Sequence, residues 1–467
     1  MKEKIHFFVT NDLHSHFENW PLAMTYLNRR KQEWKARGES FLLFDIGDHL
    51  DRVNPITEAT MGKANIALLN QAEYDFATLG NNEGITLPEE NLYHLYDDAD
   101  FHVICSNLHH QTKANPEWLQ TNRIVKTQYG TRIGVIGLTA RFNPYYHLLE
   151  WDAAPVEETI EQELMELEGK TDLIVLMSHL GINEDERIAR TFPEIDVIMG
   201  GHTHHLLRQG ETVRQSVLSA AGKFCNYISE VSITYDHDEA IVMEKEAVAK
   251  DITHLPAEPA ALESIQQLEQ KTNDILQGEI IYADEPLTVD WFQSTPIIEA
   301  LTEKVRQKTD ADCAMLNAGI LIHGFQAGAI TYKDVHQACP HPINPVVVSL
   351  NGDELLEVIR ASLSDAFMEL ELKGFGFRGK LLGRMVFANL DVQIGTLTDG
   401  HHYVKDVLFQ GQQIHRNQSY TIATADMFTF GRLLPPIARA EHKQLFLPEF
   451  LREILTDTLL DMKVNAQ

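Results

Sequence analysis

Short apolar runs recur over residues 1–200 and alternate with longer segments in which apolar positions follow a helical period. The runs have the length and the β-branched or aromatic content of buried strands. The expected strands are IHFFVT (5–10), FLLFDI (41–46), FATL (76–79), RIGVIGL (132–138), LIVLMS (173–178) and VIMG (197–200). Amphipathic helices are expected at 56–70 and 156–168. This strand–helix alternation predicts an α/β sandwich.

The pattern changes after about residue 245. Residues 245–270 are charged and contain two prolines, which indicates a connection followed by a helix. Another helix is expected at 294–309, because Ser294 or Thr295 can cap it and Pro296 falls in its first turn. New strands are expected at 346–350, 404–409 and 420–425. We therefore predict a first domain at 1–290 and a second at 291–467, with the 294–309 helix as connector.

The net charge of the chain excludes some classes of binding partner. The chain has 467 residues and a formal net charge of −29, from 68 acidic and 39 basic residues. Such an excess repels phosphate polymers and anionic membranes, so no nucleic-acid polymer or membrane partner is expected. A small anionic substrate is compatible with it if local cations, such as bound metal ions, offset the field. The composition makes no prediction of oligomeric state.

Other sequence features bear on the compartment. The first residues, MKEKIHFFVT, contain no apolar segment of the length of a secretory signal. No run approaches the roughly 20 apolar residues of a membrane helix. The four cysteines are far apart and form no CxxC pair, which indicates free thiols. We expect a cytoplasmic protein.

Residues that can bind metals follow several of the expected strands. They are Asp12 and His14 in TNDLHSH, Asp48 in DIGDH, Asn81 in GNNEG, His179 in MSHLG, and His202 and His204 in GGHTHH. Each motif alone is common in turns and loops, and a chain with 22 histidines contains chance pairs. Functional groups of α/β proteins gather beyond the carboxyl ends of strands, so the set as a whole indicates a site. Its oxygen and imidazole ligands suit two divalent ions of the Mn, Fe, Co, Ni or Zn group.

The order D-x-H, G-D, G-N-x-E, S-H, G-H-x-H resembles that of the calcineurin-type metallophosphoesterases. The opening NDLHSHF and the second domain narrow the resemblance to the 5′-nucleotidase and 2′,3′-cyclic-nucleotide phosphodiesterase family. The resemblance implies a two-sheet αββα sandwich followed by a smaller α/β domain, which binds the nonreacting part of the substrate. In this family pattern Asp12, His14 and His204 hold one ion. Asn81, His179 and His202 hold the other, and Asp48 bridges them.

The activity that the resemblance implies is hydrolysis of a phosphate ester or pyrophosphate of a nucleotide or related small molecule. Metal-activated water would attack the phosphorus in line with the leaving group. The segment LGNNEG departs from the family, in which the position of Asn82 is a histidine and that of Ile85 an aspartate that orients it. An amide can donate a hydrogen bond but cannot supply a proton. Either the substrate has a good leaving group, as a pyrophosphate does, or His16 or His49 substitutes.

The second domain also departs from the family pattern. The segment MLNAGILIHG keeps Asn317 but has Ile322 where the family has a substrate-binding arginine. Two aromatic residues of the family sandwich a nucleobase. The candidates here are Phe428 for one ring and Phe375 or Phe377 for the other, with Arg378 as the candidate contact for an anion. A non-nucleotide phosphodiester therefore stays open as the substrate.

Two further classes are alternatives. A metallophosphoesterase scaffold that keeps its ions but has lost catalysis would be a binding protein, and Asn82 and Ile322 are compatible with this. A zinc hydrolase of the metallo-β-lactamase type could use HTHH, but the chain has no HxHxDH string.

Overall fold

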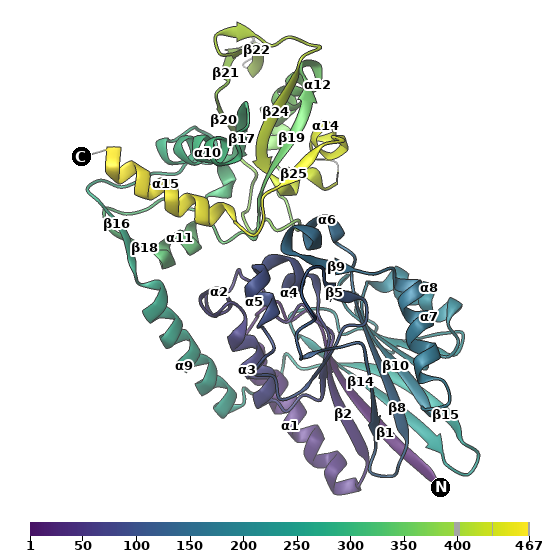
Figure 1. Cartoon of the computed structure of the whole chain (residues 1–467). Helices are drawn as coiled ribbons and strands as arrows, with labels where there is room; N and C mark the ends of the chain where they lie inside the picture. Colours follow the sequence, from purple (N-terminus) through teal and green to yellow (C-terminus); the bar gives the residue numbers. More distant parts are fainter. Residues whose placement is uncertain (397–401, 432, 466–467) are drawn as a thin grey trace. The chain divides into compact units, whose positions relative to one another are not determined.

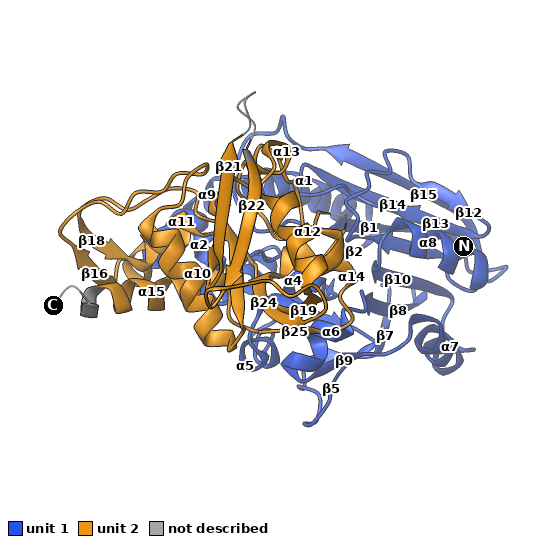
Figure 2. Ribbon diagram, turned by 90° about the horizontal axis from the view of Figure 1, so that it is seen from above, with its two compact units in different colours: residues 1–272 blue, residues 273–467 orange. Residues whose placement is uncertain are grey.

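The computed structural model describes residues 1–396, 402–431 and 433–465. It divides into two compact units, Met1–Thr272 and Asn273–Gln467 (Figures 1 and 2). The division between the units falls within helix α9 (Pro259–Leu276), whereas the domain boundary predicted from the sequence lies between residues 290 and 291. The expected helix at 294–309 is α10 (Pro296–Thr309), and it packs inside the second unit. No helix among the described residues is both long and apolar enough to cross a membrane.

Two sheets form the first unit. The first contains, in spatial order, β15 (Ile241–Asp251), β14 (Tyr227–Asp236), β1 (Lys2–Thr10), β2 (Ser40–Asp45), β3 (Phe76–Ala77), β4 (His102–Ile104) and β6 (Leu119–Gln120). The second contains β12 (Glu211–Val213), β13 (Ser216–Ser219), β11 (Val197–Gly200), β10 (Leu173–His179), β8 (Arg132–Thr139) and β7 (Asn122–Lys126). The run from β1 to β6 is parallel, as are β8, β10, β11 and β13. All six strands expected in 1–200 are present.

The core of the first unit lies between the sheets. Phe7 and Val9 of β1 belong to the same buried cluster as Val175 and Met177 of β10. The helices are α1 (Trp20–Arg37), α2 (Pro55–Thr60), α3 (Lys63–Gln71), α4 (Asn81–Thr86), α5 (Glu89–Tyr93), α6 (Asn143–Tyr146), α7 (Val156–Leu167) and α8 (Ile182–Thr191). Helices α7 and α8 share a second buried cluster with β8 and β10, and α1 packs beside β2. The αββα sandwich is thus confirmed.

Two local predictions differ from the structure. The expected helix at 56–70 is two helices, α2 and α3, because Met61 and Gly62 take left-handed angles, with φ of 46° and 82°. Residues 245–251, expected as a connection, form the greater part of the edge strand β15. Its buried positions are only the small Ala247 and Ala249, while Glu246 and Lys250 face solvent, so the strand lacks an apolar pattern. A two-stranded ribbon of β5 (Leu108–His110) and β9 (Trp151–Ala153) completes the unit.

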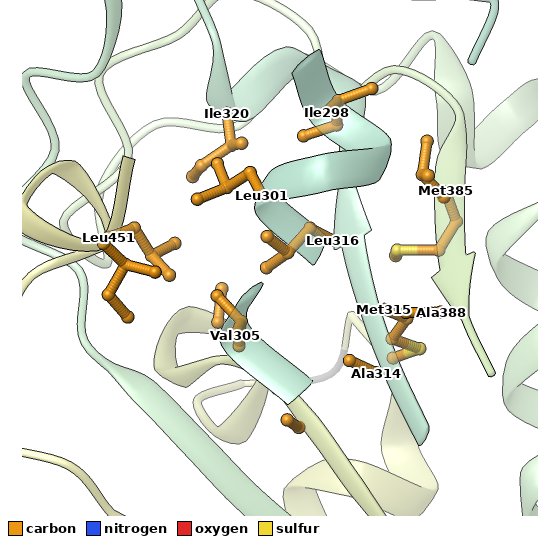
Figure 3. Packing of buried hydrophobic residues seen from close by; sticks show 14 of the residues in the cluster. Ile298, Leu301, Val305, Ala314, Met315, Leu316, Ile320, Met385, Ala388 and Leu451 are labelled. Atoms are coloured by element: carbon orange, nitrogen blue, oxygen red, sulfur yellow. The ribbon is translucent and has the colours of Figure 1, made fainter. Parts of the chain in front are cut away.

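The second unit has a five-stranded sheet of β20 (Met385–Ala388), β17 (Cys313–Asn317), β24 (Ser419–Ala425), β19 (Pro345–Asn351) and β25 (Lys443–Leu445). Smaller sheets pair β16 (Glu279–Ala283) with β18 (Gly328–Thr331), and β21 (Asp391–Thr396) with β22 (His402–Phe409) and β23 (Gln412–Gln413). The remaining helices are α11 (Tyr332–Ala338), α12 (Gly352–Ser362), α13 (Asp365–Met368), α14 (Pro435–Arg439) and α15 (Leu451–Asn465). Figure 3 shows its core, where Leu301 and Val305 of α10 lie near Leu316 of β17 and Leu451 of α15.

Candidate metal centre

The seven predicted ligands lie beyond the carboxyl ends of the central strands of the first unit. Asp12 and His14 follow β1, Asp48 follows β2, and Asn81 follows β3. In the second sheet, His179 is the last residue of β10, and His202 and His204 follow β11. Since the strands within each sheet are parallel neighbours, their carboxyl ends meet at one edge.

One group of side chains consists of Asp12, His14 and His204. The Nε2 atoms of the two histidines face each other at 3.0 Å. Asp12 Oδ1 lies 3.4 Å from Nε2 of His204 and 3.7 Å from Nε2 of His14. Three potential ligand atoms therefore converge on one point, as they do around a bound cation.

A second group consists of Asp48, His179 and again Asp12, which belongs to both groups. The Nε2 of His179 lies 3.5 Å from Oδ1 of Asp48, and its ring centre lies 5.2 Å from that of His202. His202 Nδ1 in turn lies 2.8 Å from Oδ1 of Asn81. Asp48 joins the groups, because its other oxygen, Oδ2, is 3.7 Å from Nε2 of His14. One carboxylate thus presents one oxygen to each group.

The chemistry of His179 tests whether this cluster suits a cation. The ring is buried, and its Nδ1 lies 2.7 Å from the carbonyl oxygen of Ile46, to which it can donate. In the neutral ring, Nε2 then carries a lone pair on the side of Asp48, and this nitrogen has no hydrogen-bond partner among the described residues. Burial lowers the pKa of His179, but the charge of Asp48 outweighs burial and raises the pKa to about 10. A position that attracts a proton this strongly also suits a metal ion, which would take the proton's place.

The stretch LGNNEG connects the ligand loops. Glu83 is buried, and its carboxylate accepts hydrogen bonds from the backbone N–H groups of Gly80 and Asp48 at 2.9 Å and of Leu50 at 3.0 Å. Burial, followed by the charge of Asp48, raises the pKa of Glu83 to about 7. A Cβ on Gly80 would lie 2.1 Å from Oδ1 of Asp48, so only glycine fits there. The segment holds Asp48 in place as well as supplying Asn81.

Backbone strain is concentrated at the ligands. Positive φ angles occur at Asp12 (51°), His14 (48°), Asp48 (49°), His202 (71°) and His204 (56°). This left-handed region is costly for residues other than glycine, and such outliers gather at functional sites.

The candidates for proton transfer lie in different surroundings. Asn82 Nδ2 donates to the carbonyl oxygen of Leu50 at 3.0 Å and lies 2.9 Å from Nδ1 of His14. His16 is partly exposed, has Nδ1 2.6 Å from Glu18 Oε1, and packs on Phe224 at 3.7 Å between ring centres. His49 is buried against Asn65 and Trp20, and burial lowers its pKa to about 3. The structure does not bring His49 to the ligand cluster.

Some of the predicted substrate residues of the second unit are buried in its core, and one lies at its surface. Asn317, Phe377 and Phe428 are buried: Asn317 Nδ2 donates to the Leu382 carbonyl, and Phe377 stacks on His341. Arg378 lies beside them, where its backbone N–H donates to Nδ1 of His341 at 2.9 Å. These rings therefore belong to the core and present no face to a ligand.

Phe375 differs, because its side chain is 47% exposed. Its ring lies parallel to that of Phe430, with centres 6.1 Å apart and an interplanar angle of 6°. The ring beside Phe375 is thus Phe430, and not the predicted Phe428 two positions earlier. The sequence offers one signal for this, because Phe430 precedes Gly431, which has a positive φ of 67° and marks a turn.

A third group, Glu89, His110 and Glu150, also offers ligand atoms close together. Nδ1 of His110 accepts hydrogen bonds from the backbone N–H groups of Thr112 and Lys113, so its Nε2 carries the proton that faces Glu89. Lys113 Nζ also donates to Glu89. Both ring nitrogens of His110 therefore have hydrogen-bond partners within the protein, whereas Nε2 of His179 has none among the described residues.

Comparisons with known proteins agree with this geometry. Residues 5–206 match the calcineurin-like phosphoesterase family, and residues 272–432 match the 5′-nucleotidase C-terminal domain. The chain is 40% identical over 456 residues to the uncharacterized metallophosphoesterase YunD of Bacillus subtilis (strain 168), covering 97% of this chain and 99% of the relative. It is 23% identical over 413 residues to a 5′-nucleotidase of Vibrio cholerae, covering 75% and 74%. The solved structure of Haemophilus influenzae NAD nucleotidase has the same fold, with a TM-score of 0.66, 15% identity, and 100% and 97% coverage.

The fold and the ligand cluster define a hydrolase that uses divalent metals and acts on phosphoester bonds. More particularly, the chain belongs to the calcineurin-like metallophosphoesterases of the two-domain type, in which a 5′-nucleotidase C-terminal domain follows the metal-binding domain.

Proposed function

We propose that this protein hydrolyses a phosphate ester or pyrophosphate bond of a nucleotide or related small molecule at a centre of two divalent cations. The observation that carries the proposal is Asp48, with one carboxylate oxygen toward each ligand group. Asp12, His14 and His204 would hold one ion, and Asn81, His179 and His202 the other. The mixture of imidazole, carboxylate and amide ligands suits Mn, Fe, Co, Ni or Zn.

When bound, two such cations neutralise charge on phosphoryl oxygens and lower the pKa of a water molecule, which is the chemistry that phosphoester hydrolysis needs. The chain's own residues supply a rigid frame for it. The backbone N–H of Asn82 donates to Asp48 Oδ1 at 2.8 Å, and Asn11 Nδ2 donates to Asp12 Oδ2 at 2.7 Å. Both carboxylates are therefore held in one orientation before any substrate binds.

The lack of a proton donor at Asn82 bears on the substrate. Its amide is engaged by Leu50 and His14, and an amide supplies no proton. His49 is buried away from the cluster. A phosphate leaving from a pyrophosphate needs less help from an acid than a ribose alkoxide does, so we favour a substrate with a phosphate or similarly weakly basic leaving group.

Two observations support a nucleotide. Several relatives are 5′-nucleotidases by name, including that of Vibrio cholerae. In the second unit, Phe375 and Phe430 form a parallel, partly exposed pair of rings, and base–aromatic stacking is tolerant of base identity. A cytoplasmic location is part of the proposal, supported by four free, buried cysteines. Cell fractionation would test the location.

The proposed function is tested with the full chain, stripped of metal and reconstituted with each candidate ion. A panel of 5′-nucleotides, nucleotide sugars, aryl phosphates and an aryl phosphodiester would be assayed with and without chelator. We expect metal-dependent turnover, and for the aryl phosphates a rate that falls steeply as the leaving-group pKa rises, because no acid protonates the leaving oxygen. A shallow dependence in the wild type that becomes steep in His16→Ala would instead identify His16 as the substitute acid.

Asp48→Asn supplies the matching loss-of-function variant, and it should lower both the bound metal count and the turnover. Asp75→Asn is its control, because Asp75 precedes β3, at the opposite end of that strand from Asn81, and accepts a hydrogen bond from Leu43. A wild-type protein that binds two metals yet turns over no member of the panel would contradict the proposal and favour a binding protein.

A further inference from the structure

The loop after β13 is strained beside the ligand cluster. Gly222, Phe224 and Cys225 have φ angles of 75°, 61° and 53°. Glycine adopts such angles freely, but a phenylalanine there is a genuine outlier. A strained residue persists only where its surroundings determine its conformation.

Hydrogen bonds to the first ligand loop determine it here. The N–H of Phe224 donates to the carbonyl oxygen of Asp12 at 2.7 Å, and Asn19 Nδ2 donates to the carbonyl oxygen of Phe224 at 2.7 Å. Asn11 Nδ2 donates to the carbonyl oxygen of Gly222 at 2.7 Å. The loop is thus fixed to the segment that carries Asp12 and His14.

The conformation brings one ring to the edge of the ligand cluster and one cation to that ring. The Phe224 ring lies 6.1 Å from that of His14 and 3.7 Å from that of His16, measured between centres. The Lys223 ammonium lies 4.5 Å above the Phe224 ring. Lys223 is exposed, and no ion pair joins it to an acidic group among the described residues.

In a chain with a net charge of −29, a cation next to the ring that borders the ligand cluster offsets part of the field that an anionic substrate meets. A cation–π contact alone is a weak reason to hold it at this place, since at exposed sites such contacts contribute little. A phosphate group would give the ammonium a charge-assisted partner close to the metal ligands.

We propose that Lys223 binds a nonreacting anionic group of the substrate, such as the second phosphate of a pyrophosphate, and that Phe224 is the residue that positions it. The inference deepens the proposed function and rests on it. It assigns the substrate class at this site to compounds with an anionic group beyond the phosphoryl group that reacts.

The test compares Lys223→Met with Lys223→Arg in the metal-reconstituted full chain. Lys250→Met is the matched control, because Lys250 is an exposed lysine of β15 in the same unit. The first readout is binding of inorganic pyrophosphate and of inorganic phosphate by calorimetry. We expect Lys223→Met to weaken pyrophosphate binding about tenfold and phosphate binding less than about twofold. Lys223→Arg should restore most of the affinity, and the effect should shrink as salt is raised.

The second readout is steady-state kinetics on a nucleoside diphosphate and on an aryl phosphate. Lys223→Met should raise KM for the diphosphate and leave kcat and the aryl phosphate unchanged. Phe224→Gly removes the ring while accepting the left-handed angle, so it should keep the metal affinity and still weaken pyrophosphate binding. Equal pyrophosphate affinity in Lys223→Met and Lys250→Met would overturn the inference. Since that result needs no turnover, it is distinct from failure of the proposed activity.

Discussion

The side-chain amide nitrogen of Asn82 lies 2.9 Å from Nδ1 of the ligand His14. The same nitrogen donates to the Leu50 carbonyl, and the backbone N–H of Asn82 donates to Asp48. In this protein the residue at the family's histidine position therefore supports two ligands. These contacts fix the orientation of His14 and Asp48 relative to each other.

Replacing Asn82 by alanine should weaken metal binding. The variant removes the side-chain contacts with His14 and Leu50, and loss of such outer contacts typically costs about 10–100-fold in metal affinity. Calorimetric titration of the metal-free protein with Mn²⁺ or Zn²⁺ would measure the change. Asn70→Ala is the control, because the Asn70 side chain also makes two hydrogen bonds, in its case with the backbone groups of Asp98 and Asp100. Equal affinities in the two variants would mean that Asn82 does not support the centre.

Gly80→Ala should displace Asp48. Its Cβ would come within 2.1 Å of Asp48 Oδ1 and 2.3 Å of the Asp48 nitrogen, which the chain can relieve only by moving that loop. We expect a loss of turnover of about 100-fold or more, together with a lower content of bound metal by elemental analysis. Gly278→Ala, whose Cβ would meet only ordinary contacts with Tyr332 and Ile275, should leave both unchanged. A fully active Gly80→Ala variant would show that Asp48 tolerates displacement.

Asp185 predicts a pH dependence of stability. Burial raises the pKa of its carboxyl to about 8, although the hydrogen bond from Ser178 opposes the shift. The unfolded chain loses this proton near pH 4 and the folded chain near pH 8, so the protonated carboxyl's contribution falls as pH rises between them. Asp185→Asn keeps the shape without the ionisation. Its free energy of unfolding, relative to wild type, should therefore increase by up to about 1.4 kcal/mol per pH unit over about pH 5–7.

Urea unfolding at several pH values would measure that difference. Because both proteins share every other titrating group, only the gap between the two curves is informative. Parallel curves would show that Asp185 ionises normally in the folded state.

The aromatic residues of the second unit should separate into two kinds. Phe375→Ala and Phe430→Ala remove the exposed and the partly exposed ring of the parallel pair, so each should raise KM for a nucleotide by about 5–100-fold, with little change in KM for an aryl phosphate. Phe428→Ala instead empties a buried position and should lower stability by about 3–5 kcal/mol. Kinetics on both substrates and thermal unfolding would distinguish them. The expectation is contradicted if Phe428→Ala is the variant with the selective KM effect.

The convergence of the candidate ligands was accessible from the sequence because its signal is local. A strand that ends in Asp, Asn or His can be recognised from a few residues, and parallel topology then brings distant strand ends together. Residues 204 and 12 are far apart in the chain, yet His204 Nε2 is 3.4 Å from Asp12. No side-chain geometry had to be known for that prediction.

Other features depend on packing that the sequence does not encode locally. His49 stands next to Asp48, but only the structure shows that its ring turns inward to Asn65 and Trp20. Phe428 and Phe430 differ by two positions, and their exposure is decided by the turn at Gly431. The strand β15 was missed because an edge strand with charged outer positions has little apolar pattern.

The left-handed backbone at Asp12, His14, Asp48, His202 and His204 has a consequence for handling this enzyme. At about 1–2 kcal/mol each, five such residues cost roughly as much as the whole net stability of an ordinary domain, about 5–15 kcal/mol. Cations bound by these loops would offset part of this destabilisation. The melting temperature should therefore rise with the fraction of molecules that have bound metal. A simple melting curve would then serve as a gauge of which ion, and how much of it, a preparation carries.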